Sequence, residues 1–159
     1  MMTTRHLVLS TGHPRDIAAV DALMAAAFEP RFGEAWTHGQ VLGVLAMRGV
    51  HLMLASVDDR PAGFALIRTV LDETELLLLA VDPALRRRGI GRSLLAAAMD
   101  HARNSGAHAM FLEVRAGNDA THLYARGGFT KVGERRGYYR AGIGPAHDAH
   151  SYRVDLCDR

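Results

Sequence analysis

A fully apolar segment followed by a glycine-containing turn and an amphipathic helix constrains the fold of this chain most. Residues 76–81 read LLLLAV, and such a run without polar alternation indicates a strand covered on both faces. Apolar residues at helical spacing predict a helix over 90–105, and a further apolar strand follows at 109–114. Residues 75–114 therefore predict a βαβ unit, which requires a sheet with a parallel strand pair. We expect its first strand to be the central strand of the sheet.

The flanking segments predict further strands and helices around this unit. The turn composition of residues 58–61 separates two β-type runs and predicts an antiparallel hairpin. The other expected elements are a strand over 5–10, a helix over 14–28, a short helix after Trp36-Thr37, hairpin strands over 51–57 and 62–71, a short helix from 118 or 119 to 126, and strands over 130–136 and 151–156. Residues 137–149 are expected to form a surface loop. The sum is a mixed α/β fold, a mixed sheet of about six to seven strands flanked by helices, in a single domain over 1–159.

Apolar segments of this chain are too short for a membrane span. The runs 76–81 and 94–99 have six residues each and the run 22–28 has seven, against roughly 18 for a transmembrane helix. Only three apolar residues follow Arg5 and His6 before polar Ser10, so no signal-peptide apolar region is present. The expectation is a cytoplasmic protein without membrane contact.

Charge and cysteine content exclude several classes of function. The net charge is only +2, aromatic residues make up 6%, and the basic residues cluster only at Arg86–Arg88, so nucleic acid is not expected as a partner. Cys157 is the sole cysteine, which excludes an internal disulfide and a cysteine-based metal cluster. The segment 147–150 holds two histidines and an aspartate but no third-ligand motif accompanies it, so no metal is expected.

The sharpest chemical signal is the segment Arg86-Arg87-Arg88-Gly89-Ile90-Gly91-Arg92 between the buried strand and the helix. Glycines let backbone amides approach a ligand, the free amides of a helix start favour a phosphate, and arginines add charged donors. The alternative is a glycine turn beside a solvated basic face. A Walker loop is absent because Arg92-Ser93 follows Gly91, where that loop has lysine. A dinucleotide fingerprint is weak, since Leu94 occupies its third glycine position.

Several further motifs follow one another in a fixed order: Val81-Asp82-Pro83, Arg86-x-x-Gly89-x-Gly91, Asn118 and Leu123-Tyr124-x-x-x-Gly128-Phe129. In this order and spacing, residues 75–136 resemble the GNAT superfamily of acetyl-CoA-dependent N-acetyltransferases. Within that superfamily the chain is most similar to the bacterial RimI-type alanine N-acetyltransferases of a ribosomal protein. The segments that carry this narrower likeness are Leu112-Glu113-Val114-Arg115-Ala116, Ala35-Trp36-Thr37 and Tyr138-Tyr139. Ala35, where that group usually has proline, and the 137–149 segment depart from the pattern on the acceptor side.

This resemblance implies where acetyl-CoA binds. It implies that the backbone of Leu79, Ala80 and Val81 holds the pantetheine arm at a splay in the sheet. The amides of the 86–92 segment would hold the pyrophosphate; its residues are Arg86, Arg87, Arg88, Gly89, Ile90, Gly91 and Arg92. Asn118 would bond the cofactor arm, with capping of the following helix as the alternative. The N–H of Val81 would stabilise the oxyanion formed during acetyl transfer.

The resemblance also implies the catalytic pair. Glu113 would be the base for an amine whose reference pKa is about 7.7–8.0, and Tyr124 would protonate the departing thiolate. The alternatives are a structural pairing of Glu113 with Arg115 or another arginine, and a packing role for Tyr124. Trp36 is either a core anchor or the floor of an acceptor groove, and Tyr138 is expected to contact the acceptor substrate.

The expected activity is direct transfer of acetyl from acetyl-CoA to the N-terminal alanine of a ribosomal protein. A covalent acetyl-cysteine step is not expected, because Cys157 is the only cysteine. Another protein N-terminus or a small amine is the alternative acceptor. A non-catalytic acyl-CoA-binding module and a nicotinamide-dependent oxidoreductase are the alternative classes.

Overall fold

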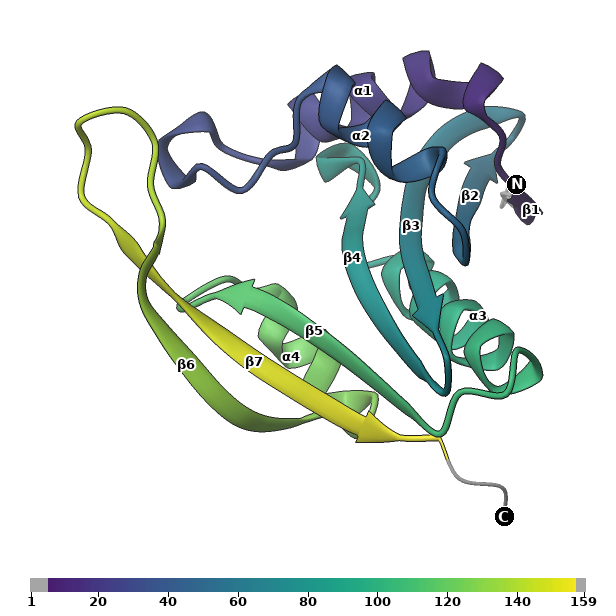
Figure 1. Ribbon diagram of the computed structural model, residues 1–159. Coiled ribbons are helices and arrows are strands. Elements are labelled where there is room, and N and C mark those ends of the chain that lie inside the picture. The colour runs from purple at the N-terminus through teal and green to yellow at the C-terminus, as the bar shows by residue number, and fades with distance from the viewer. Residues whose placement is uncertain (1–5, 157–159) are drawn as a thin grey trace.

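Seven strands form one mixed sheet in the computed structural model, which describes residues 6–156 (Figure 1). Cys157 and the first residue of the expected 5–10 strand lie outside the described residues. The strands are β1 (Leu7–Thr11), β2 (Val50–Val57), β3 (Arg60–Val70), β4 (Glu73–Val81), β5 (Ala109–Arg115), β6 (Thr130–Tyr139) and β7 (His147–Asp155). Their order is β1-β2-β3-β4-β5-β7-β6, and only β4 and β5 pair in parallel. The predicted mixed sheet, with its central strand β4, is confirmed.

Local sequence signals account for most of the connecting elements. The helices are α1 (Ile17–Ala27), α2 (His38–Leu45), α3 (Ile90–Asn104) and α4 (Ala120–Arg126), with 3-10 turns at Pro14–Asp16, Pro30–Phe32 and Pro83–Leu85. Asp58 and Asp59 have φ of 51° and 66° between β2 and β3, as a tight hairpin turn requires. Thr37 and Gln40 cap α2 reciprocally, so the short helix begins where the sequence predicts it.

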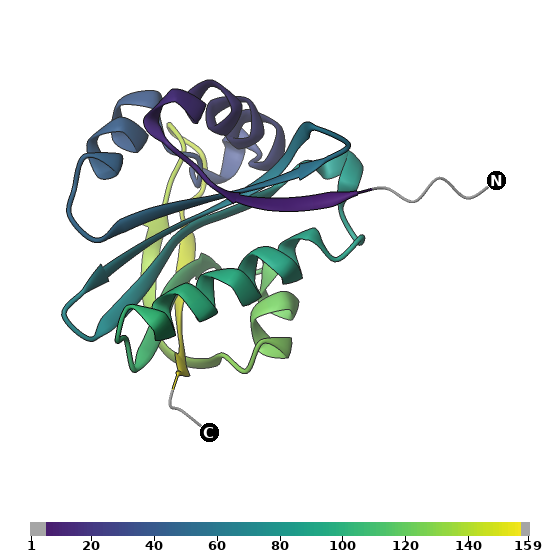
Figure 2. The same cartoon turned by 90° about the vertical axis from the view of Figure 1, so that its right-hand side faces the viewer.

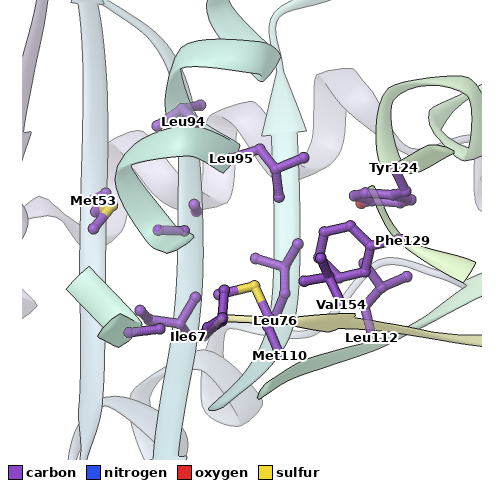
Figure 3. Close-up of a cluster of buried hydrophobic side chains, with 14 of the residues drawn as sticks. Met53, Ile67, Leu76, Leu94, Leu95, Met110, Leu112, Tyr124, Phe129 and Val154 are labelled. Carbon is purple, nitrogen blue, oxygen red and sulfur yellow. The ribbon is translucent and has the colours of Figure 1, made fainter. Parts of the chain in front are cut away.

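Helices cover both faces of the sheet (Figure 2). On one face, α1 and α2 pack on β2–β4 around Val20, Val41 and Phe64, which are at most 1% exposed. On the other face lies α3, with α4 on the same side. The core beneath α3 and α4 includes Leu94 and Met110, both fully buried (Figure 3). None of these helices within residues 6–156 is long and apolar enough to cross a membrane.

The two parallel strands separate after a short paired stretch. The β4–β5 pairing runs only from Glu73 and Ala109 to Leu76 and Leu112. At this point Leu77 is an extra residue opposite β3, because Leu66 pairs with Leu78 while Ile67 pairs with Leu76. A bulge of this kind bends a strand. Figure 1 shows β4 and β5 diverging beyond it, so the predicted splay is present.

The connection between β6 and β7 is shorter than the expected 137–149 surface loop, because both ends of that segment belong to strands. Strand β6 continues to Tyr139 and β7 begins at His147, which leaves 140–146 as the connection. Gly137 has φ of 63° and its N–H donates to Asp148 Oδ1 at 2.9 Å. The glycine and proline content suggested a loop, but this left-handed residue allows the β6 strand to shift register and carry on.

A pair of stacked histidines joins α3 to the sheet. The rings of His51 on β2 and His101 on α3 have centroids 3.8 Å apart and planes within 7°. Burial, and next to it the neighbouring His101, lower the pKa of His51 below its ordinary 6.5. His51 therefore binds a proton less readily in the folded protein than in the unfolded chain. As a result, the free energy of unfolding falls as the pH drops below 6.5.

Replacing His51 with phenylalanine should reduce this acid sensitivity. His51→Phe keeps an aromatic ring against His101 and removes the titrating group. We expect the wild type to lose more unfolding free energy than the variant between about pH 7 and pH 5, as measured by urea denaturation at both pH values. The control variant His122→Phe, at an exposed position, should keep the pH dependence of the wild type. Equal losses in wild type and His51→Phe would contradict this account.

Candidate active site

The separation of β4 from β5 leaves one edge of β4 open. Asp82 N–H donates to Ala62 O at 2.8 Å, and ladder bonds between antiparallel strands recur at every second residue. Ala80 therefore directs its backbone polar groups toward β3. Leu79 and Val81 direct theirs the other way, into the gap between β4 and β5. Two of the three expected β4 residues thus present backbone donors and acceptors to the gap, and Ala80 lies between them.

The turn after β4 leads directly into an uncapped helix start. Arg87 and Gly89 have φ of 63° and 79°, so the chain turns twice through the left-handed region before α3 begins at Ile90. No side chain caps this helix, and the first intrahelical bond is donated by Ser93 to Gly89 O at 3.0 Å. The amides of residues 90–92 precede that donor. They form the free helix start that binds phosphate groups in proteins.

The arginines of this turn differ in their surroundings. Arg86 donates from Nη2 to Ala27 O at 2.9 Å, which ties the turn to the end of α1. Arg87, Arg88 and Arg92 are exposed beside the start of α3. The backbone amides and three of the four guanidinium groups therefore remain suited to an anionic ligand.

Glu113 lies on the sheet face opposite α3 and α4. Its neighbours Leu112 and Val114 belong to the core beneath those helices, so the alternating β5 strand directs Glu113 the other way. Its Oε1 lies 2.9 Å from Nε of Arg135, with Glu113 22% and Arg135 61% exposed. The carboxylate is therefore paired with an arginine other than Arg115. On the same face, burial and then the charge of Glu113 raise the pKa of Glu75.

Tyr124 lies in α4 at the edge of the core. Its ring is 6% exposed and packs edge-to-face on Phe129 at 5.8 Å (Figure 3). Burial, followed by the proximity of Tyr139 and Glu34, raises the pKa of its hydroxyl above the ordinary value. This hydroxyl is protonated at neutral pH, as a proton donor must be. The packing role suggested by the sequence is also present.

Tyr139 lies among these groups next to Tyr138, the tyrosine expected to contact the acceptor, with ring centres 5.0 Å apart. Burial, then Glu113 and then Glu34 raise the pKa of Tyr139, so its hydroxyl is near both carboxylates. Tyr138 is 50% exposed, with the Arg135 guanidinium 5.3 Å from its ring centre. The Tyr138-Tyr139 motif therefore identifies two tyrosines beside Glu113 and its partner Arg135, and contact of Tyr138 with the acceptor stays a prediction.

Asn118 and Trp36 both have structural contacts. Asn118 Oδ1 accepts from Ala120 N at 2.9 Å, so the capping alternative is present at the start of α4. Its Nδ2 donates to Oε2 of Glu34 at 2.8 Å. No sequence motif singles out Glu34. Trp36 is half-buried against the core beneath α1 and α2, as the core-anchor alternative predicts. Within residues 6–156, no group of three or more histidine, cysteine, aspartate or glutamate side chains could hold a metal ion.

Comparison with known proteins identifies the family. The model of the acetyltransferase (GNAT) family matches residues 18–129. The chain belongs to this family.

Several GNAT relatives are named for N-terminal acetylation. The chain is 42% identical over 105 residues to the ribosomal protein bS18-alanine N-acetyltransferase of Salmonella typhimurium, covering 65% of this chain and 70% of that protein. It is 45% identical over 92 residues to the N-alpha-acetyltransferase RimI of Mycobacterium tuberculosis, covering 57% and 54%. The crystal structure of the ribosomal-protein-S18-alanine N-acetyltransferase from Escherichia coli superposes with a TM-score of 0.85, at 27% identity and over 97% and 96% of the two chains.

Membership of the GNAT family makes the chain an acetyl-CoA-dependent N-acetyltransferase. The observed geometry suits this co-substrate. An open β4 edge offers hydrogen bonds to an extended amide-containing arm, and the uncapped start of α3 offers amides to a pyrophosphate. The family, the fold and the co-substrate that the motif resemblance implied are therefore confirmed.

Proposed function

We propose that this GNAT enzyme acetylates the N-terminal alanine of a ribosomal protein, the counterpart of bS18, in the cytoplasm. The observation that carries the proposal is the position of Glu113, whose carboxylate faces away from α3 and α4 at the point where β4 and β5 separate. An acceptor amine approaching from that face meets a base at the gap. The acceptor class is supported by the 42% identity to the Salmonella typhimurium enzyme, whose name specifies alanine of bS18.

The backbone and the side chains have different roles in this reaction. Acetyl-CoA, when bound, supplies an acetyl group activated as a thioester. The N–H of Val81 faces the gap and donates to the carbonyl oxygen as negative charge develops there. Glu113 removes a proton from the attacking amine, directly or through water. Arg135 is mostly exposed, so it can leave the carboxylate when an acceptor arrives.

Tyr124 supplies the proton that the departing sulfur needs. A free thiol has a pKa of about 8.5, so a thiolate leaving group is stabilised when a proton is donated as the bond breaks. The buried hydroxyl of Tyr124 keeps its proton at neutral pH. Direct attack requires no acyl-enzyme, which agrees with a chain whose sole cysteine is Cys157.

Glu113→Gln should abolish most of the acetylation of an alanine-initiated ribosomal-protein peptide. The amide keeps the side chain's shape but cannot accept the proton, so we expect the rate to fall by about 10²–10⁴-fold. Mass spectrometry of the peptide after incubation with acetyl-CoA measures the product, beside a panel of small amines. Glu73→Gln, at the exposed far end of β4, is the matched control and should retain wild-type activity.

Three outcomes of this assay count against parts of the proposal. Full activity in Glu113→Gln would remove Glu113 as the base. Turnover of a small amine or another N-terminus without peptide product would keep the chemistry and exclude the ribosomal acceptor. Binding of acetyl-CoA without turnover of any amine would identify a non-catalytic module.

Tyr124→Phe should lower kcat while acetyl-CoA binding is retained. Phenylalanine keeps the ring packed on Phe129 and removes only the donor hydroxyl. We expect kcat to fall by at least about 10²-fold, measured as release of free CoA with the peptide as acceptor. Tyr152→Phe removes a hydroxyl from half-buried Tyr152 on β7 and serves as the control. An unchanged kcat in Tyr124→Phe would exclude the donor role.

A further inference from the structure

A buried carboxylate joins the loop before α2 to the far side of the gap. Glu34 belongs to the segment Glu29–Thr37, here named the 29–37 loop, and its side chain is only 9% exposed. Its Oε1 lies 3.0 Å from Nε of Arg115, and its Oε2 accepts from Nδ2 of Asn118 at 2.8 Å. Both oxygens are therefore used, and both partners lie more than 80 residues away in the sequence.

Each partner of Glu34 is itself held in place. The Arg115 guanidinium is centred 3.6 Å from the ring centre of Phe32, and its Nη1 donates to Ala116 O at 3.1 Å. Asn118 accepts from Ala120 N and thereby caps α4, the helix that carries Tyr124. One carboxylate thus connects the 29–37 loop with the end of β5 and the start of α4.

The same loop contacts the β6–β7 connection. An added Cβ at Gly33, whose φ is 67°, would lie 2.6 Å from Arg140 O, so the two backbones are in close contact. Phe32 packs edge-to-face on His147 at the start of β7, with ring centres 5.1 Å apart. Figure 1 shows the segment before α2 approaching the β6–β7 connection above the gap. The loop therefore borders the gap on the side from which Glu113 is reached.

The charge of Glu34 is close to the reacting groups without being free to react. Burial raises the pKa of Tyr124 and of Tyr139 most, followed by Tyr139 and Glu113 respectively, and the charge of Glu34 raises both further. Its two oxygens are occupied by Arg115 and Asn118, so it is not a spare base. Buried ion pairs are weak evidence for stabilisation, because their desolvation cost offsets their attraction. A geometric role accounts better for this arrangement.

We propose that Glu34 is a positioning residue that fixes the 29–37 loop against α4 and so sets the distance between the acceptor site and Tyr124. The proposal rests on the acceptor entering beside Glu113, as in the proposed function. The clamp acts through Arg115 and Asn118 and touches neither the open edge of β4 nor the start of α3.

Glu34→Gln tests this role by removing the charge and keeping the size. Glutamine can still accept from Asn118, but it leaves the Arg115 side chain, which is only 11% exposed, without a counter-charge. We expect KM for the alanine-initiated peptide to rise about tenfold or more, since small misplacements of a substrate-positioning element are costly. The Kd for acetyl-CoA should be unchanged. A role in stability alone would lower the active fraction, and hence kcat, without raising KM.

Hydrogen exchange supplies a readout that is independent of activity. In Glu34→Gln, the amides of residues 116–124 and of the 29–37 loop should exchange faster, while those of β2–β4 keep their wild-type protection. Glu29→Gln is the matched control, because Glu29 lies in the same loop but pairs with Arg31 at an exposed position. It should resemble the wild type in both KM and exchange.

A second variant tests the proposal if Glu34→Gln does not fold. Glu34→Asp keeps the charge beside Arg115 but is too short to hold Arg115 and Asn118 together, so it should change KM and exchange in the same direction. Wild-type KM and wild-type exchange over 116–124 in a folded Glu34 variant would overturn the proposal. If the wild type forms no acetyl-peptide, the proposed function fails, and the exchange measurement still decides whether the clamp positions α4.

Discussion

The end of pairing between β4 and β5 is the constraint on which the rest of the site depends. Backbone polar groups need partners, and a parallel neighbour would have supplied them along the whole of β4. Because the pairing stops at Leu76 and the Leu77 bulge turns the strand away, Leu79 and Val81 keep unpaired groups directed into the gap. An extended ligand with amides of its own can then complete the sheet at this edge, as an added strand would.

The two sides of the gap are built differently. On the co-substrate side, the contacts come mainly from backbone: the edge of β4 and the amides at the start of α3. On the acceptor side, they come from side chains, where Glu113 pairs with Arg135 and Glu34 pairs with Arg115. Backbone contacts depend on local turn geometry, whereas side-chain contacts depend on which strands and loops meet. The first kind is therefore compatible with many acceptors, and the second kind sets which acceptor fits.

This difference explains what could be predicted from sequence. The apolar 76–81 run, the glycines of the following turn and the helix periodicity are local signals, and they predict the βαβ unit and the co-substrate side well. Tyr139 could not be singled out, because its burial near Glu113 and Glu34 depends on a register shift in β6 and on contacts between distant strands. Glu34 could not be found, since its contact with Arg115 spans 81 residues and leaves no periodic trace. The expected 137–149 loop is too long, because glycine and proline indicate loops and also permit a bulged hairpin.

The central claim is that the open β4 edge and the uncapped start of α3 bind the co-substrate, and amide chemical shifts test it most directly. The measurement is a titration of the isotope-labelled protein with CoA, followed by two-dimensional nitrogen–proton spectra. The account predicts that the largest shifts fall on Leu79, Val81 and the amides of residues 87–92, with β1 and β2 unaffected. Shifts concentrated away from this edge and turn, or saturable binding that leaves Val81 unmoved, would contradict it.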